Sequence, residues 1–165
     1  MLVMGIDPGI AICGYGLVKQ SGSSLTPVEY GVIRTGADCA TAERLVKIFQ
    51  DVDFLIKNYR PALIGVEELF FAKNVKTAMV VGEARGVILL AAAQNKVPIL
   101  EFTPLQVKQS VVGYGRAEKK QVIYMTEKIL NLTVKPHPDD AADALAVAIC
   151  ASHHAGSGLN RGFLK

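Results

Sequence analysis

The spacing of apolar residues along the chain predicts five strands and five helices. Short apolar runs that end at Gly, Pro or a charged residue are typical of strands, and they fall at about Val3–Asp7, Ile12–Lys19, Val28–Arg34, Ala62–Val66 and Pro98–Phe102. Apolar residues that recur every three or four positions predict helices, at about Thr41–Tyr59, with Thr41 as N-cap, and at Lys76–Asn95, Pro104–Val111, Ala117–Leu132 and Asp139–His154. Three strands followed by alternating strands and helices predict an α/β fold, a mixed five-stranded sheet with helices on both faces.

The length of 165 residues, half of them hydrophobic, predicts one globular domain. We expect this domain to cover residues 1–155 and to be followed by a mobile tail, residues 156–165, which has no apolar periodicity. The longest apolar stretch, Gly86–Ala93, is shorter than the ~20 residues of a membrane helix. No signal peptide precedes the first strand, and the three cysteines are widely spaced: Cys13, Cys39 and Cys150. These features favour a cytoplasmic protein without disulfides or structural zinc.

Two acidic residues lie at the ends of predicted buried strands. Asp7 closes the first strand, and Glu67, with Glu68 beside it, closes the fourth. Binding sites of such sheets lie at the carboxyl ends of parallel strands. Considered alone, Asp7 is equally well explained as the first residue of an Asp-Pro-Gly turn.

The last predicted helix carries two further acids on one face. Asp140 and Asp143 are three residues apart, about one turn of helix. Asp139 or Asp140 could simply cap this helix. Asp143 lies inside it among Ala, Leu, Val and Ile, with no basic residue one turn away. A buried carboxylate must be paired or must coordinate a metal, so we expect Asp143 to belong to a site.

Four carboxylates, Asp7, Glu67, Asp140 and Asp143, are therefore candidates for one metal site. All-oxygen ligation suits Mg²⁺ or Mn²⁺ and not zinc. Two such ions about 3.5–4 Å apart are the usual apparatus for phosphodiester cleavage. The acids thus predict a metal-dependent hydrolase that acts on phosphates.

The distribution of charge is consistent with a polyanionic partner. The net charge is only +3, but four acids in residues 72–128 are outnumbered by Lys73, Lys76, Arg85, Lys96, Lys108, Arg116, Lys119, Lys120 and Lys128. Solvated helix faces would explain this excess about as well. Lys108, Lys119 and Lys120 have no obvious intramolecular partner in the sequence, although Glu118 is a candidate for a partial one.

Several motifs resemble the bacterial RuvC family of Holliday-junction resolvases. They are Gly5-Ile6-Asp7-Pro8-Gly9 with Gly14-Tyr15-Gly16, the stretch Val66–Asn74, Gly82–Val87, Gln106–Gly113 and Asp140–Ala146. The resemblance extends from about Val3 to Ile149, nearly the whole chain.

The resemblance implies an RNase H-like fold, a homodimer and Mg²⁺-dependent nicking of two opposing strands of a four-way DNA junction. It also implies work alongside a junction-binding and branch-migrating complex, RuvA and RuvB. The family's catalytic acids fall on Asp7, Glu67, Asp140 and Asp143, with Glu68 and Asp139 as neighbouring acids that leave the register open. Its DNA-contacting lysines fall on Lys108 and Lys119, and the aromatic residue thought to disturb base pairing falls on Phe70, beside Phe71. The full set of expected DNA contacts is Phe70, Phe71, Lys73, Lys76, Arg85, Lys108, Arg116, Lys119 and Lys120.

The predicted helix near residues 75–95 is apolar on most faces, more than one sheet face can cover. We therefore expect this helix at or near the interface of a homodimer. Three rival interpretations remain. An actin-like ATPase would need two such domains, an RNase H-like nuclease acting on RNA or on other branched DNA would keep the same acids, and a DNA-binding module without catalysis would not need Asp143.

Overall fold

The computed structural model describes residues 1–68 and 75–156, and it shows one mixed sheet in this part of the chain. The strands are β1 (Leu2–Asp7), β2 (Ile12–Ser21), β3 (Ser24–Arg34), β4 (Leu63–Glu67) and β5 (Ile99–Phe102). Their order across the sheet is β3-β2-β1-β4-β5. Because β1 is antiparallel to β2 and parallel to β4, the predicted mixed sheet is confirmed.

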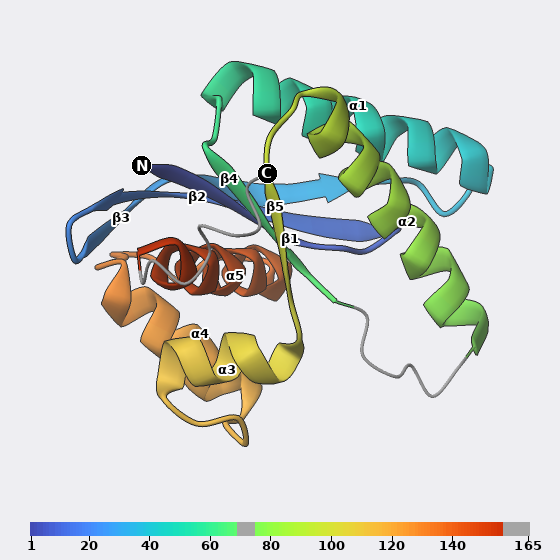
Figure 1. Ribbon diagram of the computed structural model, residues 1–165. Helices are drawn as coiled ribbons and strands as arrows, with labels where there is room; N and C mark the ends of the chain where they lie inside the picture. Colours follow the sequence, from blue (N-terminus) through green and yellow to red (C-terminus); the bar gives the residue numbers. More distant parts are fainter. Residues whose placement is uncertain (69–74, 157–165) are drawn as a thin grey trace.

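Helices cover both faces of this sheet (Figure 1). They are α1 (Thr41–Tyr59), α2 (Val75–Gln94), α3 (Pro104–Val112), α4 (Lys119–Ile129) and α5 (Asp139–Gly156). In Figure 1, α1 and α2 lie on one side of the sheet, and α5, with α3 and α4 beneath it, lies on the other. The predicted three-layer arrangement is therefore confirmed.

Several predicted boundaries were wrong. The third strand begins at Ser24 and includes Pro27, which is tolerated because β3 is an edge strand. The N-cap of α1 is Ala40 and not Thr41, and its N–H donates to the Glu43 carboxylate at 3.1 Å. The fourth helix is shorter than predicted at both ends, and α5 continues through Gly156, where the tail was expected to begin. Residues 157–165 lie outside the described part of the chain.

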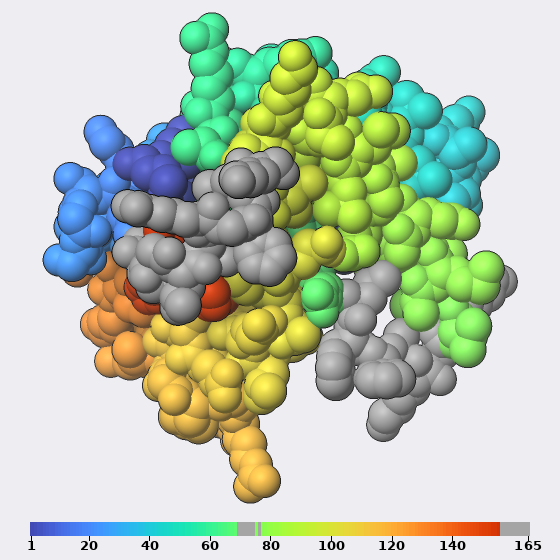
Figure 2. All heavy atoms as spheres, in the orientation of Figure 1, coloured from blue at the N-terminus to red at the C-terminus, as the bar shows by residue number. Residues whose placement is uncertain are grey.

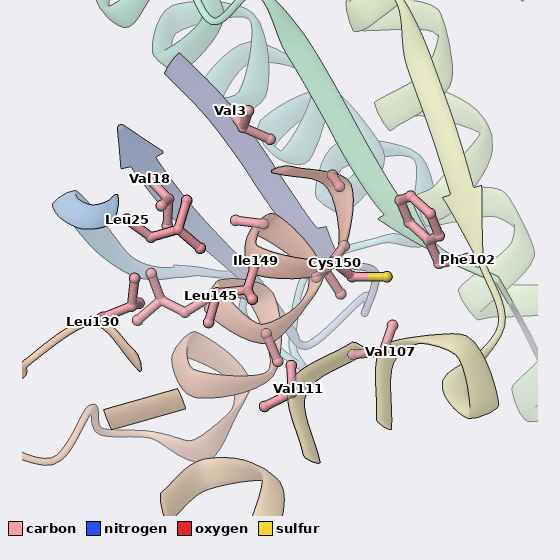
Figure 3. Close-up of a cluster of buried hydrophobic side chains, with 14 of the residues drawn as sticks. Val3, Val18, Leu25, Phe102, Val107, Val111, Leu130, Leu145, Ile149 and Cys150 are labelled. Atoms are coloured by element: carbon pink, nitrogen blue, oxygen red, sulfur yellow. The ribbon is translucent and has the colours of Figure 1, made fainter. Parts of the chain in front are cut away.

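Side chains of β1 point alternately to the two faces of the sheet, and they belong to two separate core clusters. Met4 and Ile6 of β1 pack in the cluster that contains α1 and α2. Val3 packs in the cluster on the α5 side, which Figure 3 shows in close-up. Since successive side chains point to opposite faces of a sheet, Gly5 and Asp7 point to the same side as Val3. This parity places Asp7 on the face that α5 covers.

Glycines on that face let α5 approach the sheet closely. A Cβ on Gly5 would overlap the backbone of Ala144 and Ala148, and one on Gly14 would overlap the carbonyl oxygen of Asp140. The glycines of the first hairpin thus make room for α5. As a result, residues 141, 142 and 144–151 of α5 are almost completely buried.

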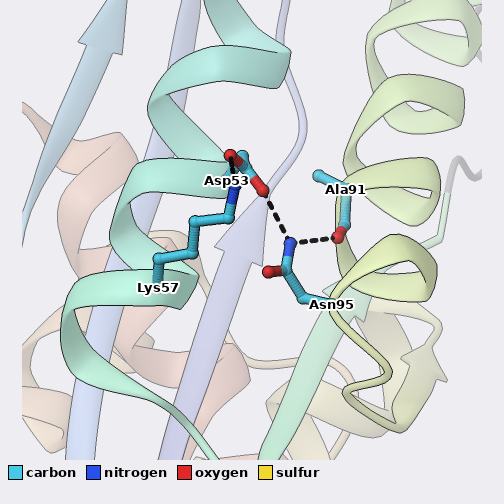
Figure 4. Close-up of polar contacts among 4 residues, drawn as sticks. All are labelled: Asp53, Lys57, Ala91 and Asn95. Atoms are coloured by element: carbon cyan, nitrogen blue, oxygen red, sulfur yellow. Dashed lines mark hydrogen bonds and ion pairs between the residues drawn. The ribbon is translucent and has the colours of Figure 1, made fainter.

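The other layer is held by a polar contact between α1 and the end of α2 (Figure 4). The Asn95 amide donates to Asp53 Oδ1 at 2.7 Å and to the Ala91 carbonyl at 2.8 Å, and Lys57 donates to the same Asp53 side chain at 2.6 Å. This contact orients α2 against α1 while leaving much of α2 uncovered.

The outer side of α2 is apolar and open to solvent. Met79 is 63% exposed and Leu90 is 50% exposed, and α2 forms a band along the surface in Figure 2. Residues Thr77–Gln94 are long and apolar enough to cross a membrane by length and composition alone, with a mean hydropathy of 1.3 and 22% of the segment buried. This segment includes the charged residues Glu83 and Arg85, so the longest uninterrupted apolar run is still Gly86–Ala93. A helix that covers a core or a subunit interface passes the same test.

Candidate active site

The first two acids are positioned by neighbouring parallel strands. Asp7 is the last residue of β1, and Glu67 is the last residue of β4. The register pairs Ile6 with Val66, so the two acids follow side by side. Gly65 faces Val147 and Ala151 of α5, and by the same alternation Glu67 also points to the α5 side.

The other two acids are delivered by the first turns of α5. Asp7 is paired with Gly14 across the β1–β2 ladder, and Gly14 touches the backbone of Asp140. The start of α5 therefore lies directly over the end of β1. Asp143 is one turn further along the same helix, and its side chain is 25% exposed. The structure thus brings the four acids to one edge of the sheet, while their roles as catalytic residues and metal ligands stay predictions.

The electrostatics of Asp7 show how closely the acids are grouped. Burial, followed by the negative charges of Glu67, Asp143 and Asp140, raises the pKa of Asp7 to about 8. Three carboxylates thus act on a fourth that is already largely desolvated. Such a cluster holds a proton at neutral pH unless a cation replaces it.

The pKa values of Glu67 and Asp143 are also raised, and burial is the main cause for both. Burial, followed by the charge of Asp143, raises the pKa of Glu67, although Lys119 and Lys108 oppose the shift. Burial also raises the pKa of Asp143, opposed mainly by its contact with Lys119. The site therefore combines an excess of negative charge with two lysines that moderate it.

A pocket of about 230 Å³ opens beside these acids. Glu67 and Asp143 contribute its acidic side, Lys108 of α3 and Lys119 of α4 its basic side, and Val107 and Val122 part of its apolar wall. The Lys119 ammonium lies 2.7 Å from Asp143 Oδ2. Acids and bases from β4, α3, α4 and α5 thus face a single open cavity.

The expectation that Lys119 and Lys120 have no intramolecular partner was wrong. Lys119 pairs with Asp143 across two helices, a contact that inspection of one helix could not reveal, and Lys120 pairs with Glu118 at 3.1 Å, as the alternative had it. Arg85, expected to contact DNA, forms an ion pair with Glu101 of β5, and its side chain is 24% exposed. This ion pair links α2 to β5.

The remaining predicted contact residues are less constrained. Arg116 is exposed in the turn between α3 and α4. Phe70, Phe71 and Lys73 lie outside the described residues, as does the side chain of Lys76, so their predicted roles stay predictions.

Glu68 and Asp139, which are adjacent in sequence to Glu67 and Asp140, have different surroundings from the four clustered acids. The backbone N–H of Glu68 donates to Phe102 at 2.7 Å, which continues the β4–β5 ladder. Asp139 pairs with Lys135 at 3.6 Å and is 45% exposed. Glu67 lines the pocket, and the charge of Asp140 acts on Asp7.

The chemistry of the four acids fits a divalent cation. Their oxygens are hard ligands of the kind that Mg²⁺ and Mn²⁺ prefer, and a cation would relieve the mutual repulsion that raises the pKa of Asp7. Among residues 1–68 and 75–156, no three His, Cys, Asp or Glu side chains lie close enough to hold one ion as they stand.

The fold and the acid cluster together define an RNase H-like protein with a carboxylate site at the carboxyl ends of its central strands. The sequence model described as crossover junction endodeoxyribonuclease RuvC matches residues 3–151, and the chain belongs to that family of nucleases, which depend on divalent metal ions.

Named relatives agree in sequence and in structure. The chain is 56% identical to the crossover junction endodeoxyribonucleases RuvC of Alkaliphilus metalliredigens and Heliobacterium modesticaldum, over 93% of this chain and 93% and 94% of theirs. It is also similar to T. thermophilus RuvC in complex with a Holliday junction substrate, with a TM-score of 0.88 and 34% identity over 96% of this chain and 97% of that one.

Proposed function

We propose that this protein resolves four-way DNA junctions by metal-dependent nicking of two opposing strands, in recombination and repair. The observation that carries the proposal is the convergence of Asp7, Glu67, Asp140 and Asp143 beside a pocket that also holds Lys108 and Lys119. Membership of the RuvC family supports the choice of a branched DNA substrate over RNA.

In this proposal the four acids hold Mg²⁺, in all two ions per site, for which Mn²⁺ can substitute. When bound, such ions activate a water nucleophile and stabilise the charge of the attacking and leaving oxygens. The charges of the other three acids all act on Asp7, so we assign Asp7 the role of anchoring the ions. Glu67 reaches the pocket from the end of β4, and Asp143 reaches it from α5.

The basic residues of the pocket bind the sugar-phosphate backbone. Lys108 and Lys119 line the same pocket as Glu67 and Asp143, so a backbone phosphate that enters the pocket would lie within reach of both lysines and close to the acid cluster. Arg116 is exposed in the turn that precedes α4, and Lys120 is exposed in the first turn of α4. Both extend the basic surface beside the pocket. Phosphate contacts of this kind position the DNA without reading its sequence. Phe70 is assigned to stacking on an unpaired base.

A homodimer would present two such sites to the two equivalent strands of a junction. The exposed apolar side of α2, with Val75, Met79 and Leu90 at 73%, 63% and 50% exposure, supplies the surface that a second copy would cover. We assign the protein to the cytoplasm and to the same process as the junction-binding and branch-migrating proteins RuvA and RuvB.

A gel assay with synthetic substrates tests the proposal. A four-way junction, a linear duplex and an RNA hairpin would be incubated with and without Mg²⁺. We expect symmetric nicks in the junction only, and only with the metal. Cleavage of the RNA hairpin in preference to the junction would support the RNase H-like alternative, and cleavage without metal would contradict the site.

The matched variant is Asp7→Asn, which retains the shape of the side chain and removes its charge. We expect cleavage to be lost while junction binding is kept or strengthened, because one negative charge near the phosphates is removed. Normal nicking by Asp7→Asn would refute the assignment of the site.

A further inference from the structure

The contact between Lys119 and Asp143 joins a predicted DNA-binding residue to a predicted metal ligand. Lys119 is the first residue of α4, and its ammonium lies 2.7 Å from Asp143 Oδ2 on α5. The Asp143 side chain is 25% exposed and faces the pocket, whereas the Lys119 side chain is 58% exposed. Lys119 therefore places a positive charge inside the acid cluster and keeps much of its length in solvent.

This position conflicts with a metal ion at the same carboxylate. A cation bound to Asp143 would lie within a few ångströms of the ammonium, where two positive charges repel each other strongly in a partly buried site. Nothing in the contact holds Lys119 in place against that repulsion, because a lysine is a point charge on a flexible four-carbon stem. Its exposed stem allows it to turn toward the open side of the pocket.

We propose that Lys119 is a built-in counter-ion of the acid cluster, which a divalent metal displaces from Asp143 and which then binds a phosphate of the DNA. The inference rests on the proposed function, since it requires that Asp143 bind metal. The exchange links the two ligands: a phosphate that holds Lys119 away from Asp143 removes the competitor of the metal, and a bound metal frees Lys119 for the phosphate. Such coupling is reciprocal by thermodynamic necessity.

Lys108 provides a matched comparison within the same pocket. It lines the pocket with Lys119, and its charge also acts on Glu67. In the described part of the chain, however, the structure gives Lys108 no ion pair with a carboxylate, while Lys119 has one. Removing either lysine deletes one positive charge near the acids, but only removal of Lys119 deletes the ion pair.

The test is a calorimetric titration of the full-length protein with Mn²⁺ in the absence of DNA. We expect the affinity of Lys119→Met for Mn²⁺ to be at least about five times that of Lys108→Met. Both variants should bind Mn²⁺ at least as tightly as the original protein. Equal affinities for the two variants would overturn the exchange, because deletion of charge would then explain the whole effect. Thermal unfolding of each variant without metal checks that both are folded.

Asp143→Asn separates this inference from the proposed function. If Asp143→Asn binds Mn²⁺ as tightly as the original protein, the metal site itself is wrong, and the exchange with it. If Asp143→Asn loses affinity while Lys119→Met and Lys108→Met behave alike, the metal site stands and only the exchange is refuted.

A crystal structure of the original protein with Mn²⁺ gives a readout that does not depend on activity. We expect the ammonium of Lys119 to be more than about 4 Å from Asp143, beyond ion-pair contact. A metal bound to Asp143 with the ion pair still intact would overturn the proposal.

Discussion

Helices α5 and α2 are similar in composition but lie in opposite environments. Both are largely apolar and rich in Ala, and α2 also contains several Val and Leu residues. The sheet, α3 and α4 enclose α5, whose residues 144–151 are almost fully buried, whereas α2 packs mainly on α1 and exposes Met79 and Leu90. An apolar helix is therefore not by itself a core helix. The closeness with which α5 approaches the sheet makes it the platform of the site, and the uncovered side of α2 makes it the candidate interface.

The largest expected effect separates two acids on α5. Asp143→Asn should reduce junction cleavage about a thousandfold or more, because several kcal/mol of charge stabilisation would be lost. Asp139→Asn should keep much of its activity, since Asp139 is 45% exposed and pairs with Lys135. Single-turnover cleavage rates of both variants would measure this. Equal losses would mean that the face of α5 toward the site has been wrongly assigned.

The two helices should also differ in their contribution to folding. Leu145 of α5 is fully buried against Gly16, so Leu145→Ala should lower the free energy of unfolding by about 2–5 kcal/mol. Leu90→Ala on α2 removes a side chain that is 50% exposed, so it should lower the free energy of unfolding of the subunit far less. Urea unfolding of both variants, carried out at several protein concentrations, measures the difference. A comparable loss in the two would contradict the contrast between them.

Association should depend on α2 and not on other exposed apolar residues. Met79→Lys should weaken the homodimer at least about tenfold, because a charge would be buried in an apolar interface. Phe54→Lys on α1 is the control, since Phe54 is 65% exposed and lies on a different helix. Light scattering at micromolar concentration would detect the shift toward monomer. Dissociation by Phe54→Lys alone would move the interface to α1.

The smallest effect concerns pH and reports the burial of Asp7 together with the charges of the acids around it. The pKa of Asp7 in the folded protein, about 8, lies above its unfolded value of about 3.9, so the folded state binds this proton more tightly. The free energy of unfolding of the metal-free protein should therefore fall as the pH rises from about 4 to about 8. Asp7→Asn cannot ionise and should show a weaker decline, amounting to a few degrees in melting temperature. Identical pH profiles in EDTA would contradict this origin of the shift.

Much of the site could be predicted because its signals are local. The apolar runs that end in Asp7 and Glu67 identify two strand ends, and the three-residue spacing of Asp140 and Asp143 places both on one helix face. Periods of two and of 3.6 residues are properties of the backbone, so they can be recognised in the sequence without knowledge of the fold.

The tertiary structure alone decided which groups face one another. The sequence of α5 offers Asp143 no basic partner one turn away, yet Lys119 reaches it from α4, and Arg85 of α2 pairs with Glu101 of β5. It also decided that α5 is enclosed and α2 is not, although their compositions are alike. Such pairings depend on the order of the strands and on the layer in which each helix lies, and both arise from contacts between residues far apart in the chain, which a local periodicity cannot encode.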